Sequence, residues 1–461
     1  MNLPPGPRST LELMRTLVQR TKDPIRFYKN IFQKYGGIVF FQLGPYKFAM
    51  LNDADAIHEV LHKNAGLYTK STGYERFKLI LGNGLLISEG EVWKKQRRLM
   101  SWAFASKHIE RVFPVMVSET RDMLKSWEGK TEVDLALEMN SVTLQVISQS
   151  LFGKRHQGGD SLLVRRSLQN ILEYLQTTRH LWIQLLIAPL PIRDKRRAAL
   201  KIEASLPLRD TRTFFSSIEK LDQLVEEMIT EGRAQKGSEN FLDTMISATD
   251  SEDHTQMDNQ QLRDEVISVL VAGHETTANA LTWTWHLLLA HPEVLGKVTE
   301  EVGWVVSGEA PKFDELSALT YTKAVLEESM RLYPPFWRIS RKNAEDATVG
   351  GYRIPANTTV IAAIFSIQRN PTYWERPEEF LPERFLEKGR SENRFAYIPF
   401  GAGPRACVGS QFAMVEALTI LSICIKAYRF ERTSPTFPEL FTSLTLQPKG
   451  GCKVTLKKRG A

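Results

Sequence analysis

The segment from residue 260 to residue 290 restricts the possible folds more than any other part of the chain. Its apolar residues recur at the spacing of an α-helix, and from 266 to 272 they occupy every face of that predicted helix. A helix that is apolar all round has no face suited to water, so it runs through the middle of a large domain. With 461 residues, the chain is long enough to surround such a helix.

Helical spacing also describes most of the remaining chain, whereas strand-like alternation is confined to short segments. Further helices are predicted over 90–106, 114–127, 138–152, 161–178, 212–234, 292–305, 321–332 and 408–427. A β-hairpin around Gly44 and Pro45 is predicted over 36–52, and further strands are predicted over 350–364 and 443–456. The sequence contains no internal repeat and no Gly/Ser-rich linker. We therefore expect a single mainly α-helical domain over residues 1–461, with a small β portion.

The composition excludes several classes of protein. Hydrophobic residues make up 42% and charged residues 25% of the chain, which is ordinary for a globular protein and excludes a disordered or collagen-like chain. The net charge of +7 fits a basic patch for an acidic partner, but it is too diffuse to indicate nucleic acid. The three cysteines form no CxxC pair and are too few for a disulfide framework, so they favour the reducing cytosol.

The sequence predicts no membrane segment. The N-terminus, MNLPPGPRST, has neither the basic nor the apolar region of a signal peptide, and no run of 18 apolar residues occurs. The longest apolar stretch, residues 181–192, is interrupted by prolines. We interpret it as core or as an apolar flap at the mouth of a binding site.

The strongest chemical signal is the decapeptide FGAGPRACVG, which runs from Phe400 to Gly409 directly before a predicted helix. Its glycines and proline make a tight loop that directs one side chain, Cys407. Backbone N–H groups at a helix N-terminus favour the thiolate, and thiolate is the form that a metal ligand or a nucleophile requires. A lone cysteine is usually a buried cysteine in a turn, but this loop carries the complete pattern F-x-x-G-x-R-x-C-x-G.

With that pattern complete, the sequence resembles the cytochrome P450 superfamily of haem-thiolate monooxygenases. The resemblance covers essentially the whole chain, and its LPPGP start and LTLQP turn are most similar to the bacterial fatty-acid hydroxylases and their microsomal relatives. It implies a single triangular P450-type fold, with haem b between the central helix 260–290 and the cysteine loop with its following helix. Cys407 would ligate the iron, and Phe400, Arg405 and Gly409 would contact the haem.

The central helix contains the sequence AGHETT at 272–277, which matches the oxygen-activation motif of the family. The resemblance implies that Ala272 and its glycine neighbour leave room for dioxygen, and that Glu275 and Thr276 relay protons to it. A glycine inside a helix costs about 1 kcal/mol relative to alanine. A buried glutamate costs more. Both residues are therefore poor choices for a helix that only has to pack.

The propionates of haem require cations, and the resemblance assigns these as well. Trp93 and Arg97 match the pattern W-x-x-x-R, whose spacing directs both side chains to one side of a helix. Arg341 and Arg405 match two further propionate contacts of the family. The agreement in register with the other motifs, rather than the presence of arginines, supports this assignment.

Other polar residues of the helices are given structural roles. Glu328 and Arg331 are three residues apart on one helix face, and the resemblance joins them to Arg384 in a cluster that ties this helix to the segment before the cysteine loop. His274 and His286 are interpreted as core or surface histidines rather than metal ligands.

One helix surface has two interpretations. Lys94, Lys95 and Arg98 turn away from Trp93 and Arg97 on the predicted helix 90–106. This basic cluster would suit the docking of an acidic ferredoxin, flavodoxin or reductase. A solvated charged face without a partner explains the same residues equally well.

The resemblance also places residues near the substrate. The expected substrate pocket is almost entirely apolar and includes Leu86, Ile87, Val271, Ala272, Phe336, Trp337, Ile339 and Ser443. A lipophilic substrate is therefore expected, and a fatty acid, a terpenoid and a polyketide all remain open.

We interpret the chain as a monooxygenase that inserts one oxygen atom from O2 into such a substrate, with electrons from NAD(P)H through a separate partner protein. A soluble, monomeric, cytoplasmic enzyme of bacterial type is expected, in preference to a microsomal protein that has lost its anchor, and no fused reductase is expected. The alternatives are a haem-thiolate enzyme that uses peroxide or rearranges its substrate, and a haem-binding sensor without turnover.

Overall fold

The computed structural model describes residues 2–9, 12–13, 19, 23–153, 159–176, 183, 186–187, 190, 195–206, 208–234, 240–386 and 393–459. These residues form two compact units. The first unit comprises Met1–Thr72, Phe113–Thr143 and Gly273–Ala461, and the second comprises Gly73–Val112 and Leu144–Ala272. Most of the predicted apolar stretch 181–192 lies outside the described residues.

Three long helices contribute residues to both units, and the chain passes from one unit to the other within them. They are α6 (Ser106–Ser126), α7 (Leu135–Phe152) and α13 (Asn259–Ala290). The central helix is thus predicted almost to the residue. The predicted start of a helix at Pro114 is wrong, because α6 begins earlier and continues through this proline. Proline lacks the N–H that a helix interior uses, but α6 continues on both sides of it.

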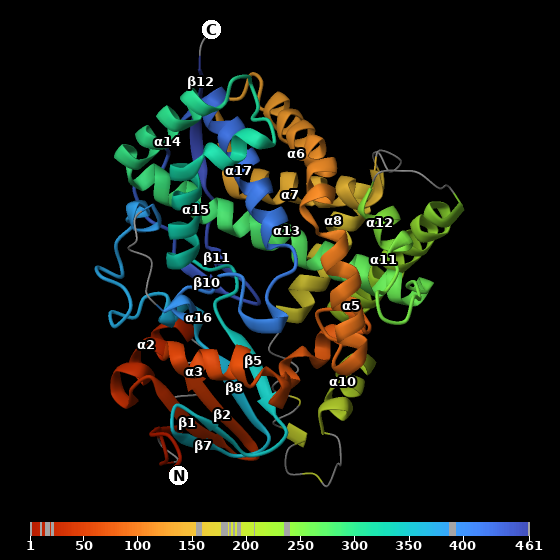
Figure 1. Cartoon of the computed structure of the whole chain (residues 1–461), viewed down its shortest axis with the longest axis vertical. Helices are drawn as coiled ribbons and strands as arrows, with labels where there is room; N and C mark the ends of the chain where they lie inside the picture. Colours follow the sequence, from red (N-terminus) through yellow and green to blue (C-terminus); the bar gives the residue numbers. More distant parts are fainter. Residues whose placement is uncertain are drawn as a thin grey trace. The chain divides into compact units, whose positions relative to one another are not determined.

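Several helices belong to the first unit alone (Figure 1). They are α2 (Pro24–Tyr35), α3 (Ala54–His58), α14 (Pro292–Val305), α15 (Thr320–Leu332), α16 (Ile364–Ile367) and α17 (Ser410–Ala427). Short helical turns connect them: η1 (Glu59–Lys63), η2 (Ala65–Leu67), η5 (Asp314–Ala318), η6 (Pro382–Phe385), η7 (Arg394–Ala396) and η8 (Gly403–Arg405). Of these helices, α14, α15 and α17 pack against one another.

The largest sheet of the first unit has the strand order β1-β2-β8-β5-β3. Its strands are β1 (Ile38–Leu43), β2 (Tyr46–Leu51), β3 (Tyr68–Lys70), β5 (Ile339–Asn343) and β8 (Thr358–Ala362). The predicted hairpin over 36–52 is confirmed, since β1 and β2 pair antiparallel around a turn in which Gly44 has φ 56°. Figure 1 shows α2 and α3 beside these strands. Strand β5 of this sheet carries the predicted site residues Ile339 and Arg341.

The remaining strands form three small sheets. They are β6 (Ala347–Val349) with β7 (Tyr352–Ile354), β10 (Leu440–Thr442) with β11 (Leu446–Pro448), and β4 (Glu132–Asp134) with β12 (Lys453–Lys458) and β9 (Tyr428–Arg432). The predicted strand segment 443–456 is therefore divided between two sheets. Gly450 and Gly451, both with positive φ, turn the chain between β11 and β12.

The second unit is built mainly from helices. Besides its parts of α6, α7 and α13, these are α4 (Lys78–Leu81), α5 (Gly90–Ala103), α8 (Gly159–Gln176), α10 (Lys195–Ser205), α11 (Arg209–Ala234) and α12 (Phe241–Ser247), with the turn η3 (Thr72–Phe77) at the boundary. Stacking of Tyr174 on Phe214, with ring centroids 4.0 Å apart, joins α8 to α11. The prediction of a mainly α-helical fold with a small β portion is confirmed.

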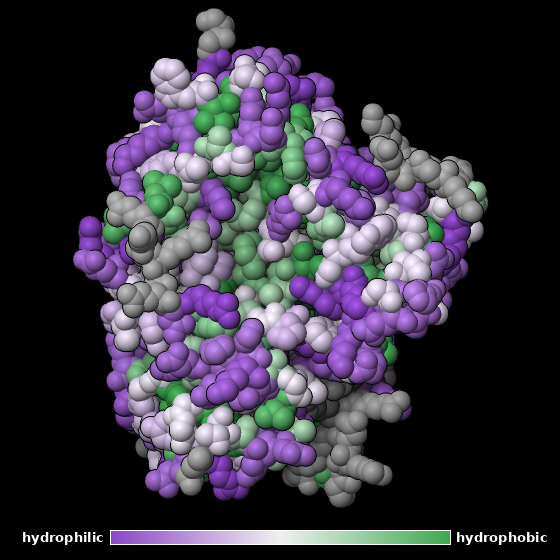
Figure 2. Space-filling view, viewed as in Figure 1, coloured by the Kyte–Doolittle hydropathy of each residue, from purple (hydrophilic) through white to green (hydrophobic). Residues whose placement is uncertain are grey.

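By length and composition, α17 is the one helix among the described residues that could cross a membrane. However, 61% of this stretch is buried within the protein. It packs against α14, α15 and β9 of the same unit. Hydrophilic side chains predominate on the face of the molecule shown in Figure 2. The surroundings of α17 are those of a core helix.

Candidate functional site

The cysteine loop of the first unit is folded by backbone hydrogen bonds and by glycines. The N–H of Cys407 donates to the carbonyl of Phe400 at 2.8 Å, and the N–H of Ala406 donates to the carbonyl of Gly403 at 3.0 Å. Gly403 has φ 72°, and a Cβ at this position would lie 1.8 Å from the carbonyl oxygen of Leu61 in η1. Only glycine fits both the left-handed backbone and this close approach.

This loop holds Cys407 three residues before α17 begins at Ser410. Cys407 is exposed, whereas Cys424 and Cys452 are buried. Burial raises the pKa of Cys452 to about 12 and that of Cys424 still further, so these two thiols stay protonated. Cys407 is thus the cysteine whose surroundings suit a thiolate ligand for a soft or borderline metal such as haem iron.

Two of the predicted haem contacts lie in the same unit as Cys407. Arg341 lies on β5, between β8 and the edge strand β3, opposite Val360 and Lys70, and is 7% exposed. One of its guanidinium nitrogens donates to the carbonyl of Ser340 at 3.0 Å. Arg405 is half-buried in η8. The deeply buried guanidinium of Arg341 is stable beside an anionic group such as a propionate.

The predicted oxygen-activation motif lies on α13. Thr276 is half-buried, and it lies one turn from Ala272 on the same face of the helix. Glu275 is buried, and its carboxyl oxygen accepts hydrogen bonds from the hydroxyl of Thr445 at 2.9 Å and from the side-chain amide of Gln447. Burial raises the pKa of Glu275, and these two hydrogen bonds oppose that increase.

The histidines of α13 have the packing roles that the sequence predicts. His274 is buried, and its carbonyl accepts a hydrogen bond from the hydroxyl of Thr143 at 3.1 Å. The ring of His286 lies 3.1 Å from the carbonyl of Gly451, and burial lowers its pKa to about 4. Within the described ranges, no group of three or more His, Cys, Asp or Glu side chains is placed to bind a metal ion.

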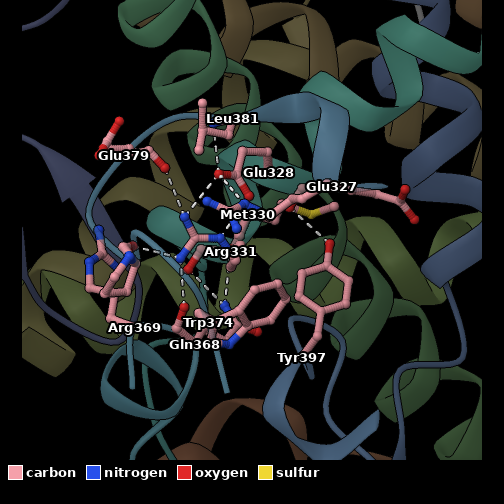
Figure 3. A network of polar contacts seen from close by, with 12 residues as sticks. Glu327, Glu328, Met330, Arg331, Gln368, Arg369, Trp374, Glu379, Leu381 and Tyr397 are labelled. Atoms are coloured by element: carbon pink, nitrogen blue, oxygen red, sulfur yellow. Dashed lines mark hydrogen bonds and ion pairs between the residues drawn. The ribbon is translucent and has the colours of Figure 1, made fainter. Parts of the chain in front are cut away.

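The structure brings together the predicted Glu-Arg-Arg cluster. Figure 3 shows Glu328 and Arg331 of this cluster. The Arg331 guanidinium donates to both oxygens of Glu328, at 2.7 and 2.9 Å, and Arg384 donates to Glu328 at 3.1 Å. Arg331 also donates to the carbonyls of Gln368, Pro377 and Glu379. The cluster therefore ties α15 to the irregular chain that precedes the cysteine loop.

The predicted pocket residues of the first unit come from neighbouring segments. Trp337 is buried, and its indole N–H donates to the carbonyl of Ser443 at 3.1 Å. Phe336 and Ile339 are half-buried in the same stretch of chain as Trp337. This segment and the turn between β10 and β11 are thus joined directly.

The predicted pocket residues of the second unit lie on a turn that is bound to α13. The N–H of Asn83 donates to Asp264 at 2.7 Å, and the N–H of Leu85 donates to Glu265 at 3.0 Å. Leu86 and Ile87 follow in this turn, and Val271 is buried further along α13. Neither acidic residue was predicted from the sequence, although two adjacent carboxylates at the start of an apolar helix are an unusual pattern.

Trp93 and Arg97 lie half-buried on α5 of the second unit, at the expected spacing. The basic residues on the other side of this helix are paired. Lys94 contacts Glu91 at 2.7 Å, and Lys95 contacts Asp253 at 2.8 Å.

Arg98 is paired in the same way, with Asp250 at 2.7 Å and Glu252 at 2.9 Å. The acidic segment 250–253 therefore neutralises much of the basic cluster. This favours the interpretation of a solvated charged face over that of a docking site for an acidic protein.

The sequence has clear relatives among known proteins. The profile of the cytochrome P450 family matches residues 4–455. The chain is 31% identical to cyclooctat-9-en-7-ol 5-monooxygenase of Streptomyces melanosporofaciens, over 88% of this chain and 85% of that protein. It is also 31% identical to cyclooctatin synthase of the same organism, over 88% and 86%. Pentalenene oxygenase of Streptomyces avermitilis is 28% identical to it, over 89% and 88%.

The chain therefore belongs to the cytochrome P450 family. It is an oxidoreductase, a monooxygenase of the haem-binding type. Two residues of the first unit fit a haem group. The accessible thiol of Cys407 suits the iron, and the buried guanidinium of Arg341 on β5 suits a propionate carboxylate.

Proposed function

We propose that this protein oxygenates a lipophilic substrate of the terpenoid class, with haem b bound through Cys407 and with electrons from a separate ferredoxin, flavodoxin or reductase. The observation that carries the proposal is the exposed Cys407 thiol, held by the glycine loop in a chain that belongs to the P450 family. Two relatives are named for the oxygenation of cyclooctat-9-en-7-ol and of pentalenene, which supports a terpenoid over a fatty acid or a polyketide.

In this proposal each residue has a defined part. Cys407 as thiolate holds the haem, and its glycine loop keeps the sulfur in place. With haem bound, the guanidinium groups of Arg341 and Arg405 would neutralise propionate charges. For Arg97 and for the indole N–H of Trp93, on the second unit, contacts to the propionates are implied by the family pattern alone. The bound haem supplies the binding and activation of dioxygen.

The remaining residues control protons and substrate. The hydroxyl of Thr276 and the carboxyl of Glu275 accept and donate the protons that the reaction consumes. Apolar side chains such as Phe336 and Trp337 orient the substrate and exclude water from it. The presence of both an acidic and a hydroxyl side chain at 275 and 276 supports the monooxygenase over a haem-thiolate enzyme that needs no proton delivery.

A spectroscopic and a chemical measurement test the proposal together. The reduced carbon monoxide complex of the purified protein should show the red-shifted Soret band of thiolate ligation. With a surrogate ferredoxin and its reductase, NADPH and 18O-labelled O2, a cyclic terpene alcohol should acquire one labelled oxygen atom per molecule. The Cys407→Ser variant serves as the control for both.

The alternatives give different results in the same assay. A peroxide-using enzyme would form product only when peroxide is added, and then without NADPH and without label from O2. A rearranging enzyme would convert an added hydroperoxide without either. A haem-binding sensor would show the thiolate spectrum but no turnover with any substrate. Absence of the red-shifted band from the wild-type protein would contradict the haem-thiolate assignment itself.

A further inference from the structure

The carboxyl group of Glu275 is held by a turn that the sequence analysis did not connect to it. This turn, residues 443–447, follows β10 and includes the first two residues of β11. The hydroxyl of Thr445, which is 1% exposed, donates to Oε1 of Glu275 at 2.9 Å. The side-chain amide of Gln447 donates to the same oxygen. Oε1 therefore accepts two hydrogen bonds from one short segment of chain.

Donor and acceptor roles in this network have one consistent assignment. The side-chain amide of Asn279 on α13 donates to the hydroxyl oxygen of Thr445 at 3.2 Å, and that of Gln447 donates to it at 3.1 Å. A hydroxyl has a single proton and two acceptor sites. With both acceptor sites filled by amides, the Thr445 proton points to Glu275. Because Oε1 accepts from two donors, any proton on this carboxyl group is carried by Oε2.

The turn is fixed independently of Glu275. The indole N–H of Trp283 on α13 donates to the carbonyl of Leu446 at 3.1 Å, and the N–H of Leu446 donates to the carbonyl of Pro335 at 2.9 Å. Trp337 donates to Ser443 in the same turn. Hydrogen bonds to α13 and to the segment 335–337 therefore hold Thr445 and Gln447 in position next to Glu275.

The pKa of Glu275 responds to opposing influences. Burial raises it, while the hydrogen bonds from Thr445 and Gln447 stabilise the carboxylate and lower it. Among the residues that the structure describes, no charged side chain adds to these influences. The two hydrogen bonds are therefore what keeps a deeply buried carboxyl able to release its proton.

We propose that Thr445 and Gln447 are positioning residues for proton delivery, which hold Oε1 of Glu275 as an acceptor and so direct its exchangeable proton to Oε2. The proposal deepens the proposed function and rests on it, because it assumes that Glu275 takes part in proton delivery. It also connects the predicted substrate pocket to proton delivery. The turn that holds Glu275 includes the predicted pocket residue Ser443, whose carbonyl accepts a hydrogen bond from Trp337.

The test compares variants that remove one hydrogen bond each, Thr445→Val and Gln447→Leu. The carboxyl stretching band of Glu275 is identified by infrared difference spectroscopy from its loss in Glu275→Gln, and is titrated in the resting holoenzyme without turnover. Both variants should titrate at higher pH than the wild type, because the carboxylate loses a donor. Thr445→Ser, which keeps the hydroxyl, should restore the wild-type titration.

A matched control lies on the same helix as Glu275. Thr282 is buried, and its hydroxyl donates to the backbone carbonyl of Ala278 at 2.7 Å. Thr282→Val should leave the infrared titration unchanged. Haem content and the carbon monoxide spectrum of every variant show whether the fold is intact.

The second readout is the pH dependence of coupled turnover, as product formed per NADPH consumed. The part of the wild-type pH profile that is lost in Glu275→Gln reports the ionisation of Glu275. In Thr445→Val and Gln447→Leu this part of the profile should move to higher pH, as the infrared titration does. Wild-type titration in both variants would overturn the proposal, and so would an infrared shift that the pH profile does not follow. Failure of the proposed function is distinguishable, because the wild-type protein would then form no oxygenated product at all.

Discussion

Arg331 and Glu328 form an ion pair in which neither side chain has any exposed surface, with both carboxylate oxygens bound by the guanidinium. The remaining guanidinium donors bind backbone carbonyls of the chain that precedes the cysteine loop. All polar groups of this charged pair are therefore used. A pair of this kind fixes one arrangement of α15 and that chain, because any other arrangement would leave a buried charge without its partners.

Arg331→Ala is expected to destabilise the protein by about 3–5 kcal/mol, because it leaves the buried Glu328 carboxylate without its main partner. Denaturant unfolding followed by circular dichroism measures the loss. Lys457→Ala is the control, since its pair with Glu431 is largely exposed, with 61% and 58% of the side chains accessible. That variant should change stability by less than about 1 kcal/mol. Equal losses in the two variants would contradict the structural role of the buried cluster.

Cys407→Ser is expected to remove the red-shifted carbon monoxide band while leaving the helical circular dichroism spectrum unchanged. A hydroxyl is a much poorer donor to haem iron than a thiolate, and the substitution leaves the backbone hydrogen bonds and the glycines of the loop in place. Cys452→Ala, at a buried cysteine outside the loop, should keep the band. A red-shifted band that persists in Cys407→Ser would show that another residue ligates the iron.

Thr276→Ala is expected to uncouple NADPH consumption from product formation. Without the hydroxyl, protons reach bound dioxygen in a disordered way, and the reducing equivalents leave as hydrogen peroxide. The measurement is peroxide released per NADPH consumed in the reconstituted system. Thr284→Ala is the control on the same helix, because the buried hydroxyl of Thr284 donates to the carbonyl of Ala280. An unchanged ratio in Thr276→Ala would exclude a relay role for Thr276.

The sequence predicted the features that depend on local pattern. The helix α13 and the β1–β2 hairpin follow directly from periodicity, because burial imposes the spacing of apolar residues along each segment. The Glu-Arg-Arg cluster followed from resemblance, since two of its members lie three residues apart and the third is recognised only from the family pattern.

The partners of Glu275 could not be predicted in this way. Thr445 is 170 residues away in sequence, and it reaches Glu275 only because β10 and β11 turn the chain back onto α13. Nothing in the local sequence around Thr445 and Gln447 indicates that these side chains bind a buried carboxyl group. The acidic partners of Lys95 and Arg98 were missed for the same reason, because the segment 250–253 reads by itself as an ordinary polar loop.

Glu265 gives a prediction about the dependence of stability on pH. This residue of α13 is fully buried; burial raises its pKa to about 8, and the N–H of Leu85 is its hydrogen-bond donor. Because the folded state holds this proton more tightly than the unfolded state, stability should fall as pH rises from about 4.5 to about 8, by up to about 1.4 kcal/mol per pH unit. Glu265→Gln cannot ionise, so its denaturant midpoint should fall less steeply over the same range. Parallel pH profiles for the variant and the wild type would show that Glu265 does not carry this proton.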